Sequence, residues 1–150
     1  LVDGVIALAL AELSTAPSEG ADWAERACAW MQALRAELNR HPAVIPLLRA
    51  NPVLVPAVLA QLEGLLEDLE AAGIDSKRAA RAAWEMLWFT LSFVLAEQPP
   101  TFAAAESRTN ELPKIAKVLP DLLALSANKI FEATANHLTK GIREDLRGRS

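Results

Sequence analysis

The stretch WEMLWFTLSFVLAEQ, residues 84–98, decides the fold of this chain. It carries no charge from Met86 to Ala96, although the chain of 150 residues has a net charge of −4. It is too short for a membrane span, which needs about 20 apolar residues. It also nearly lacks the polar face that a surface helix shows at a 3.6-residue period. We therefore predict a helix that protein covers on most sides.

The composition favours helices over strands. Ala and Leu dominate, Tyr is absent, and only 6 residues are Gly. Hydrophobic residues make up 52% and charged residues 23%, which is typical of a folded domain rather than a disordered chain. No stretch alternates apolar and polar residues as a half-buried strand does. We predict one all-α domain over residues 1–150, a bundle of about six to seven helices.

Local signals predict where the helices begin and end. Asp22 with Glu25 three positions later has the pattern of a capping box. The helix that follows should end before Pro42. Pro56 is expected near the start of a later helix, and Gly73 at that helix's C-terminal cap. Other helices are predicted over 1–13, as a single turn within 43–52, over 77–97, over 112–119 and from about 121 onward, with loops at 14–21 and 98–111.

Residues that catalyse reactions or hold metals are sparse. The single cysteine, Cys28, is interpreted as a buried, inert thiol, and the two histidines, His41 and His137, lie far apart. Three glutamates within 63–70 share a helical stripe, which we interpret as a solvated face. No glycine-rich phosphate loop, Glu-x-x-His pair or Gly-x-Ser-x-Gly elbow occurs in the sequence. We predict no enzymatic activity, no metal site and no cofactor.

The charge pattern limits the partners of the chain. The acidic balance and scattered Lys and Arg argue against a duplex-DNA surface in these residues, because phosphate contacts need clustered basic groups. No signal peptide is recognisable, and one cysteine makes no internal disulfide. We expect a cytoplasmic protein with no membrane contact.

The tryptophans allow two interpretations. Trp30, Trp84 and Trp88 fall on the apolar faces of two different predicted helices, and the last two are one turn apart. They form either an ordinary packed core or an apolar cavity for a hydrophobic ligand, since such cavities are commonly lined by aromatic residues and lie between helices.

Several stretches also resemble, in the same order, one known family. WFTLSFVLAEQ, residues 88–98, is similar to the FTLG-VL--Q stretch of the tetracycline-repressor family of bacterial transcription regulators, with Ser92 where glycine is usual. LVDGVIALAL, residues 1–10, resembles the helix that links the DNA-binding domain to the regulatory domain. Further resemblances are DWAERACAWMQALRAELNRHP (22–42), LEDLEAAGID (66–75), ELPKIAKVL (111–119) and ANKIFEATANHLTKGI (127–142).

The resemblance implies the C-terminal ligand-binding and dimerisation domain of a transcriptional regulator, most simply a repressor. An N-terminal helix-turn-helix domain is then expected before Leu1, with residues 1–13 as the linking helix. Operator DNA is expected to bind only through that domain. Two copies are expected to form a homodimer in which the helix at 77–97 and the last helix build a four-helix bundle.

The resemblance also suggests a class of effector. Tetracycline repressors hold a drug–metal chelate with polar side chains and a histidine, and the matching positions here are Trp30, Leu48 and Leu65. The expected effector is therefore a small apolar or aromatic molecule rather than a tetracycline–magnesium complex. Asn51 is either a polar contact or a turn residue before Pro52. The predicted effector-binding residues are Trp30, Leu34, Leu48, Asn51, Leu65, Leu66, Trp84, Leu87 and Trp88.

The predicted dimer interface uses the other flank of the helix at 77–97 and the last helix. One flank, with Trp84, Leu87 and Trp88, is expected to face its own core. The opposite flank is expected to face the second copy. Two alternatives remain open: a monomer that covers 84–96 with its own loop, and a helical dimerisation or interaction module without a small-molecule ligand. The predicted interface residues are Met86, Phe89, Phe93, Phe131, Ala135, Leu138 and Ile142.

Overall fold

The computed structural model describes residues 22–50, 56–97 and 111–148 of the chain. No strand occurs in these residues, and the predicted all-α class is confirmed. The predicted helix at 1–13, the loop at 14–21 and nearly all of the loop at 98–111 lie outside the described residues. The elements follow in the order α2 (Trp23–Arg40), the 3-10 helix η1 (Pro42–Val44), α3 (Ile45–Ala50), α4 (Pro56–Ala71), α5 (Ser76–Glu97), α6 (Pro113–Ala124) and α7 (Ala127–Arg147).

Helix α2 begins with the predicted capping box. Asp22 Oδ1 accepts a hydrogen bond from the Glu25 backbone N–H at 3.0 Å, and Glu25 Oε2 accepts from the Asp22 backbone N–H at 3.1 Å. Each carboxylate thus satisfies a backbone donor that the first turn of a helix leaves without a partner. The helix ends at Arg40, before Pro42, as the sequence predicts, and Pro42 starts η1.

The turn after α4 depends on the predicted glycine. Gly73 has φ of 86°, a left-handed conformation that favours glycine. Its N–H donates to the Glu70 carbonyl at 2.9 Å, and the Ile74 N–H donates to the Leu69 carbonyl at 3.2 Å. This pair of bonds is a Schellman motif, and both apolar residues of the motif, Leu69 and Ile74, are buried in the core. The turn is therefore fixed by its backbone and by packing.

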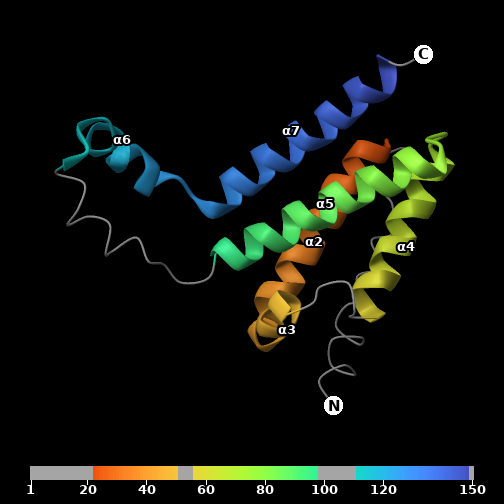
Figure 1. The fold of residues 1–150 in the computed structure, drawn as a ribbon, viewed down its shortest axis with the longest axis horizontal. Coiled ribbons are helices and arrows are strands. Elements are labelled where there is room, and N and C mark those ends of the chain that lie inside the picture. Colours follow the sequence, from red (N-terminus) through yellow and green to blue (C-terminus); the bar gives the residue numbers. More distant parts are fainter. Residues whose placement is uncertain (1–21, 51–55, 98–110, 149–150) are drawn as a thin grey trace.

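Helix α5, which contains the decisive stretch, lies at the centre of the bundle. It contacts α2, α4 and α7 (Figure 1). Its N-cap is Asp75, whose Oδ1 accepts from the Arg78 backbone N–H at 3.2 Å. The buried Thr90 hydroxyl donates to the Met86 carbonyl at 2.9 Å, so its polar group is satisfied inside the core. The buried residues of α5 are Ala79, Ala82, Ala83, Met86, Leu87, Thr90, Leu91 and Val94.

An arginine ties three helices together at the C-terminal end of α5. Arg35 Nε donates to Glu97 Oε2 at 2.9 Å, and its Nη2 pairs with the other carboxylate oxygen. The guanidinium carbon lies 5.2 Å from the ring centroid of Phe93 and 4.9 Å from that of Phe131, and Phe89 stacks on Phe131 at 5.1 Å. The hydrogen bond from Arg35 holds the pKa of Glu97 below its ordinary range, although partial burial opposes this shift. The ion pair and the ring contacts thus join α2, α5 and α7.

The boundary between the last two helices differs from the prediction. The sequence predicts one helix ending near 119 and another beginning near 121. Instead, α6 continues through Pro120 to Ala124, and α7 begins at Ala127. The signal that sets this boundary is Ser126, whose hydroxyl accepts from the Lys129 backbone N–H at 3.2 Å and caps α7. Figure 1 shows α6 lying apart from the other helices.

Candidate functional site

The structure brings several predicted effector-binding residues into one core. Trp30 and Leu34 of α2, Leu65 of α4 and Leu87 of α5 are all buried in it, and Leu66 packs at its edge. Three helices thus supply these apolar side chains, as expected for a site between helices. Effector binding by these residues stays a prediction. The Leu48 side chain and Asn51 lie outside the described part of the chain.

Trp30 has an unusual feature for a core residue. Its side chain is only 6% exposed, yet its indole N–H has no hydrogen-bond partner among the described residues. A buried donor without an acceptor costs about 1–3 kcal/mol. Other buried polar groups avoid this cost, since the Thr139 hydroxyl donates to the Ala135 carbonyl at 3.1 Å. A phenylalanine at position 30 would fill an apolar core without leaving a donor unpaired.

The structure reverses part of the predicted division of α5 into two flanks. Trp84 and Trp88 were expected to face the core, but they are 38% and 43% exposed and contact each other edge to face at 5.9 Å. Met86, expected on the outer flank, is 0% exposed. From Met86 to Ala96 the helix is apolar nearly all round, so this part gives little periodic signal for the inner side, whereas Arg81 and Glu85 mark the outer side of the first half. The small side chains of Ala79 and Ala83 lie on the buried side, where α2 and α4 can approach closely.

The predicted interface residues of α7 lie mainly inside the chain. Phe131, Ala135 and Ile142 are buried, and Leu138 is partly buried. Phe89 and Phe93 of α5 are also partly buried, because both rings pack against Phe131. A role for any of these side chains in dimerisation stays a prediction. Large hydrophobic side chains that are exposed elsewhere are Leu59, Leu112, Ile115, Val118, Leu122, Leu125 and Ile130.

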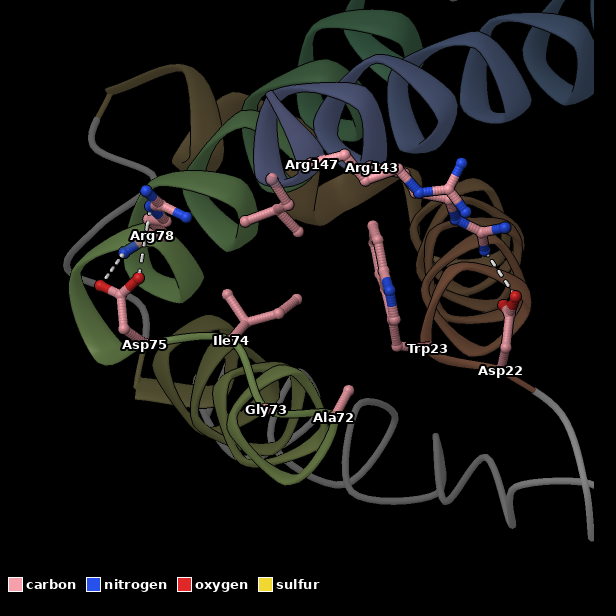
Figure 2. Close-up of a pocket in the computed structure, with 10 residues that line it drawn as sticks. Asp22, Trp23, Ala72, Gly73, Ile74, Asp75, Arg78, Arg143 and Arg147 are labelled. Atoms are coloured by element: carbon pink, nitrogen blue, oxygen red, sulfur yellow. Dashed lines mark hydrogen bonds and ion pairs between the residues drawn. The ribbon is translucent and has the colours of Figure 1, made fainter. Parts of the chain in front are cut away.

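A hollow of about 460 Å³ lies where the start of α2, the α4–α5 turn and the end of α7 meet (Figure 2). We call it the α2–α5–α7 hollow. None of the predicted effector-binding residues whose side chains the structure describes lines it, and the sequence prediction missed it. The lining comes from segments more than a hundred residues apart along the chain, so no local pattern marks it. Its apolar lining includes Trp23, Ile74 and Leu146, and its charged lining is Asp22, Asp75, Arg78, Arg143 and Arg147.

Two ion pairs stand at the rim of this hollow. Arg143 Nη2 lies 2.5 Å from Asp22 Oδ2, and the Arg143 guanidinium carbon lies 5.6 Å from the Trp23 ring centroid. Arg78 Nε lies 3.3 Å from Asp75 Oδ2. The hydrogen bond from the Glu25 backbone N–H lowers the pKa of Asp22, and Arg143 lowers it further. The rim therefore carries two pairs of opposite charge beside an apolar wall.

A smaller hollow of about 270 Å³ contains the single cysteine. The Cys28 thiol donates to Asn136 Oδ1 at 3.5 Å and lies 3.6 Å from Thr139 Oγ1. Partial burial raises the pKa of this thiol, so it stays protonated at neutral pH. This favours the predicted inert thiol over a nucleophile.

The described residues offer neither a cluster of metal ligands nor a membrane-spanning helix. Within 22–50, 56–97 and 111–148, no group of three or more His, Cys, Asp or Glu is placed to hold a metal ion. In the same segments, no helix is both long and apolar enough to cross a membrane.

Comparison with known proteins relates the whole domain to one family. Residues 16–142 match the family described as "Tetracyclin repressor-like, C-terminal domain". The fold is similar to the crystal structure of a possible TetR family transcriptional regulator from Streptomyces coelicolor A3(2). That similarity has a TM-score of 0.75 and 25% sequence identity, and it covers 95% of this chain and 74% of that chain. No match to a curated protein was found.

Proposed function

The chain belongs to the family of tetracyclin repressor-like C-terminal domains, and from this we propose that it forms a homodimer and binds a small apolar effector. Its class is that of a non-enzymatic regulatory domain of a transcriptional regulator. In this proposal, effector binding changes the relative placement of the helices. That change controls operator binding by a helix-turn-helix domain outside the present sequence. A ligand can do so only if it binds the two arrangements unequally.

The exposure of Trp84 and Trp88 carries the proposal of a homodimer. Two adjacent indole rings on an outer helix face leave a large apolar area in water, at about 25 cal/mol per Å². This side of α5 continues through Arg81 and Glu85 to Asp145 of α7. The outer sides of α5 and α7 therefore form one surface. A second copy related by a twofold axis presents the same surface, and self-complementary pairing of this kind is the commonest form of homodimer.

Sedimentation velocity of two variants tests the dimer. The double change Trp84→Ser and Trp88→Ser is expected to convert a dimer into a monomer, because the exposed ring area is lost while the buried core stays intact. Leu59→Ser removes an exposed apolar side chain of α4 and serves as the matched control, which should remain dimeric. Far-UV circular dichroism confirms that both variants stay helical. A wild-type chain that sediments as a monomer at high concentration would contradict the proposal.

The unpaired N–H of Trp30 carries the proposal of an effector. The donor lies in an apolar core formed by α2, α4 and α5, and a ligand with one acceptor oxygen would satisfy it. The proposed effector is therefore mostly apolar with a single carbonyl or ether oxygen. The other side chains of this core are apolar, so they would contribute contact area to the effector but no further hydrogen bonds.

Calorimetric titration with a matched pair of compounds tests the effector proposal. Fluorenone carries a carbonyl and fluorene does not, while their shapes are similar. Trp30→Phe is expected to weaken fluorenone binding about tenfold, the value of one buried hydrogen bond, and to leave fluorene binding unchanged. Trp84→Phe is the control and should alter neither. If neither compound nor a wider apolar panel binds, the alternative of a dimerisation module without a ligand is favoured.

A further inference from the structure

We propose that α6 is a contact site for a second copy of this chain, in which two α6 helices pair antiparallel about a twofold axis close to Val118. This goes beyond the proposed function, because the proposed homodimer uses the outer sides of α5 and α7. The contact surface is the α6 stripe, which we define as Leu112, Ile115, Val118, Leu122 and Leu125.

The α6 stripe leaves large apolar side chains in water. Each of its five residues is between 43% and 52% exposed. Ile115, Val118 and Leu122 are three and four positions apart, so they share one face of the helix, and the other two residues stand at its ends. Exposed apolar side chains that adjoin in this way are typical of a surface that another molecule covers.

The helical bundle of the same chain leaves this stripe uncovered. Figure 1 shows α6 lying beyond the start of α7, apart from α2, α4 and α5. Among the described residues, no side chain of the core cluster comes from α6. The stripe is therefore open to a second molecule, and pairing there does not require the bundle to rearrange.

Two charges beside the stripe identify the occupant as a copy of the same helix. Lys114 lies four positions before Val118 and Asp121 three positions after it, so both lie one turn from Val118 along the same edge of the stripe. Both are exposed, and neither forms an ion pair among the described residues. In an antiparallel pair with its axis near Val118, Lys114 of one copy lies opposite Asp121 of the other. The twofold axis repeats this contact, which gives two attractive pairs.

The same pattern disfavours other occupants. An anionic membrane surface attracts lysines but repels an aspartate at the edge of the apolar face. An unrelated protein would not need opposite charges at equal distances from the centre of the stripe. A twofold pair needs this symmetry, because the same surface meets itself with its direction reversed.

The size of α6 sets the strength of the contact. The helix has 12 residues, which makes it about 18 Å long. Stable protein interfaces bury about 1,200–2,000 Å² in total, and two helices this short bury less. The α6 contact is therefore weak and depends on concentration, and it joins single chains or the dimers formed through α5 and α7.

Disulfide cross-linking of the full chain tests the pairing. Val118→Cys in a Cys28→Ser background places one thiol per chain at the proposed axis. Leu59→Cys in the same background is the matched control, because Leu59 is 46% exposed and Val118 is 43% exposed. The Val118→Cys chain is expected to form an intermolecular disulfide at least tenfold faster under mild oxidation. Equal rates overturn the proposal, and a chain that instead sediments with phosphatidylserine vesicles identifies a membrane surface as the occupant.

Charge exchange tests the antiparallel register. Within the Val118→Cys background, Lys114→Glu and Asp121→Lys are each expected to slow cross-linking about fivefold to tenfold, because two attractive pairs become two repulsive ones. The two changes alter the charge near the thiol in opposite directions, so an effect on the thiol alone cannot slow both. Lys114→Glu combined with Asp121→Lys is expected to restore the rate to within about twofold. Lys117→Glu is the control, since Lys117 lies on the polar side of α6, and its rate should stay unchanged. Failure of the combined variant to recover overturns the pairing.

Trp84→Ser with Trp88→Ser separates this contact from the proposed homodimer. The Val118→Cys cross-link is expected to persist in that variant, because α6 contains neither tryptophan. Loss of the cross-link there places α6 inside the α5–α7 dimer and overturns a separate contact. A chain that cross-links at Val118→Cys but never forms the α5–α7 dimer refutes only the proposed homodimer.

Discussion

Two glycines, one inside α4 and one just after its end, should respond in opposite directions to the same substitution. Gly64 lies inside α4, and Gly73 caps that helix with φ of 86°. No atom of the described residues lies within 4 Å of a Cβ added at either position, so packing does not distinguish them. Only the backbone conformation differs. We expect Gly64→Ala to stabilise the chain and Gly73→Ala to destabilise it.

The magnitudes follow from the backbone alone. Alanine in place of glycine inside a helix stabilises by about 0.5–1 kcal/mol. At Gly73, the left-handed conformation costs alanine about 1–2 kcal/mol. Alanine also makes the unfolded chain less flexible, which offsets about 0.4–1 kcal/mol of this cost. The net loss at Gly73 is therefore about 0.5–1 kcal/mol, and the two variants should differ by roughly 1–2 kcal/mol.

Chemical denaturation followed by circular dichroism measures this difference. All variants are compared at one protein concentration, because association would make the apparent stability depend on concentration. A thermal scan should separate the two midpoints by roughly 2–8 °C for a chain of this size. Gly73→Asn is a useful control, since asparagine tolerates the left-handed region better than alanine and should lose less stability. If Gly73→Ala is as stable as wild type or more stable, the account of the α4–α5 turn is wrong.

Three further predictions concern groups already described. Glu97→Gln should lower the free energy of unfolding by about 2 kcal/mol at neutral pH, since it leaves Arg35 without its anion. Because the folded-state pKa of Glu97 is lowered, this difference from wild type should persist at pH values above the ordinary pKa of about 4.3 and shrink as the pH falls through the folded-state pKa. A difference that does not change with pH would contradict this. Phe131→Ala should cost about 3–5 kcal/mol in urea denaturation, because the buried ring contacts two others and a guanidinium, whereas Phe131→Leu should cost clearly less; equal losses would argue against a packed cluster. Cys28 should react with iodoacetamide more slowly than glutathione at pH 7 and gain rate only at higher pH, since burial raises the pKa of its thiol, and rapid alkylation of the folded chain would refute that assignment.

Much of the secondary structure was predictable because its signals are local. The capping box at Asp22, the helix end before Pro42 and the glycine cap at Gly73 each depend on a few neighbouring residues and their backbone conformation. The predicted boundary between the last two helices was wrong because local signals were misinterpreted there. The sequence predicts a boundary between 119 and 121, but α6 runs through Pro120 to Ala124, and the cap at Ser126 sets the start of α7.

The sequence by itself determined that this chain is a helical bundle with an apolar central helix and the order of stretches typical of its family. Only the tertiary structure decided which side of that helix faces inward. The part of the helix from Met86 to Ala96 is apolar nearly all round and carries little periodic signal, so the choice there follows from where α2, α4 and α7 pack against it. The same holds for the α2–α5–α7 hollow. Asp22, Ile74 and Arg143 meet there only because the fold joins distant segments, and no local sequence pattern predicts that they do.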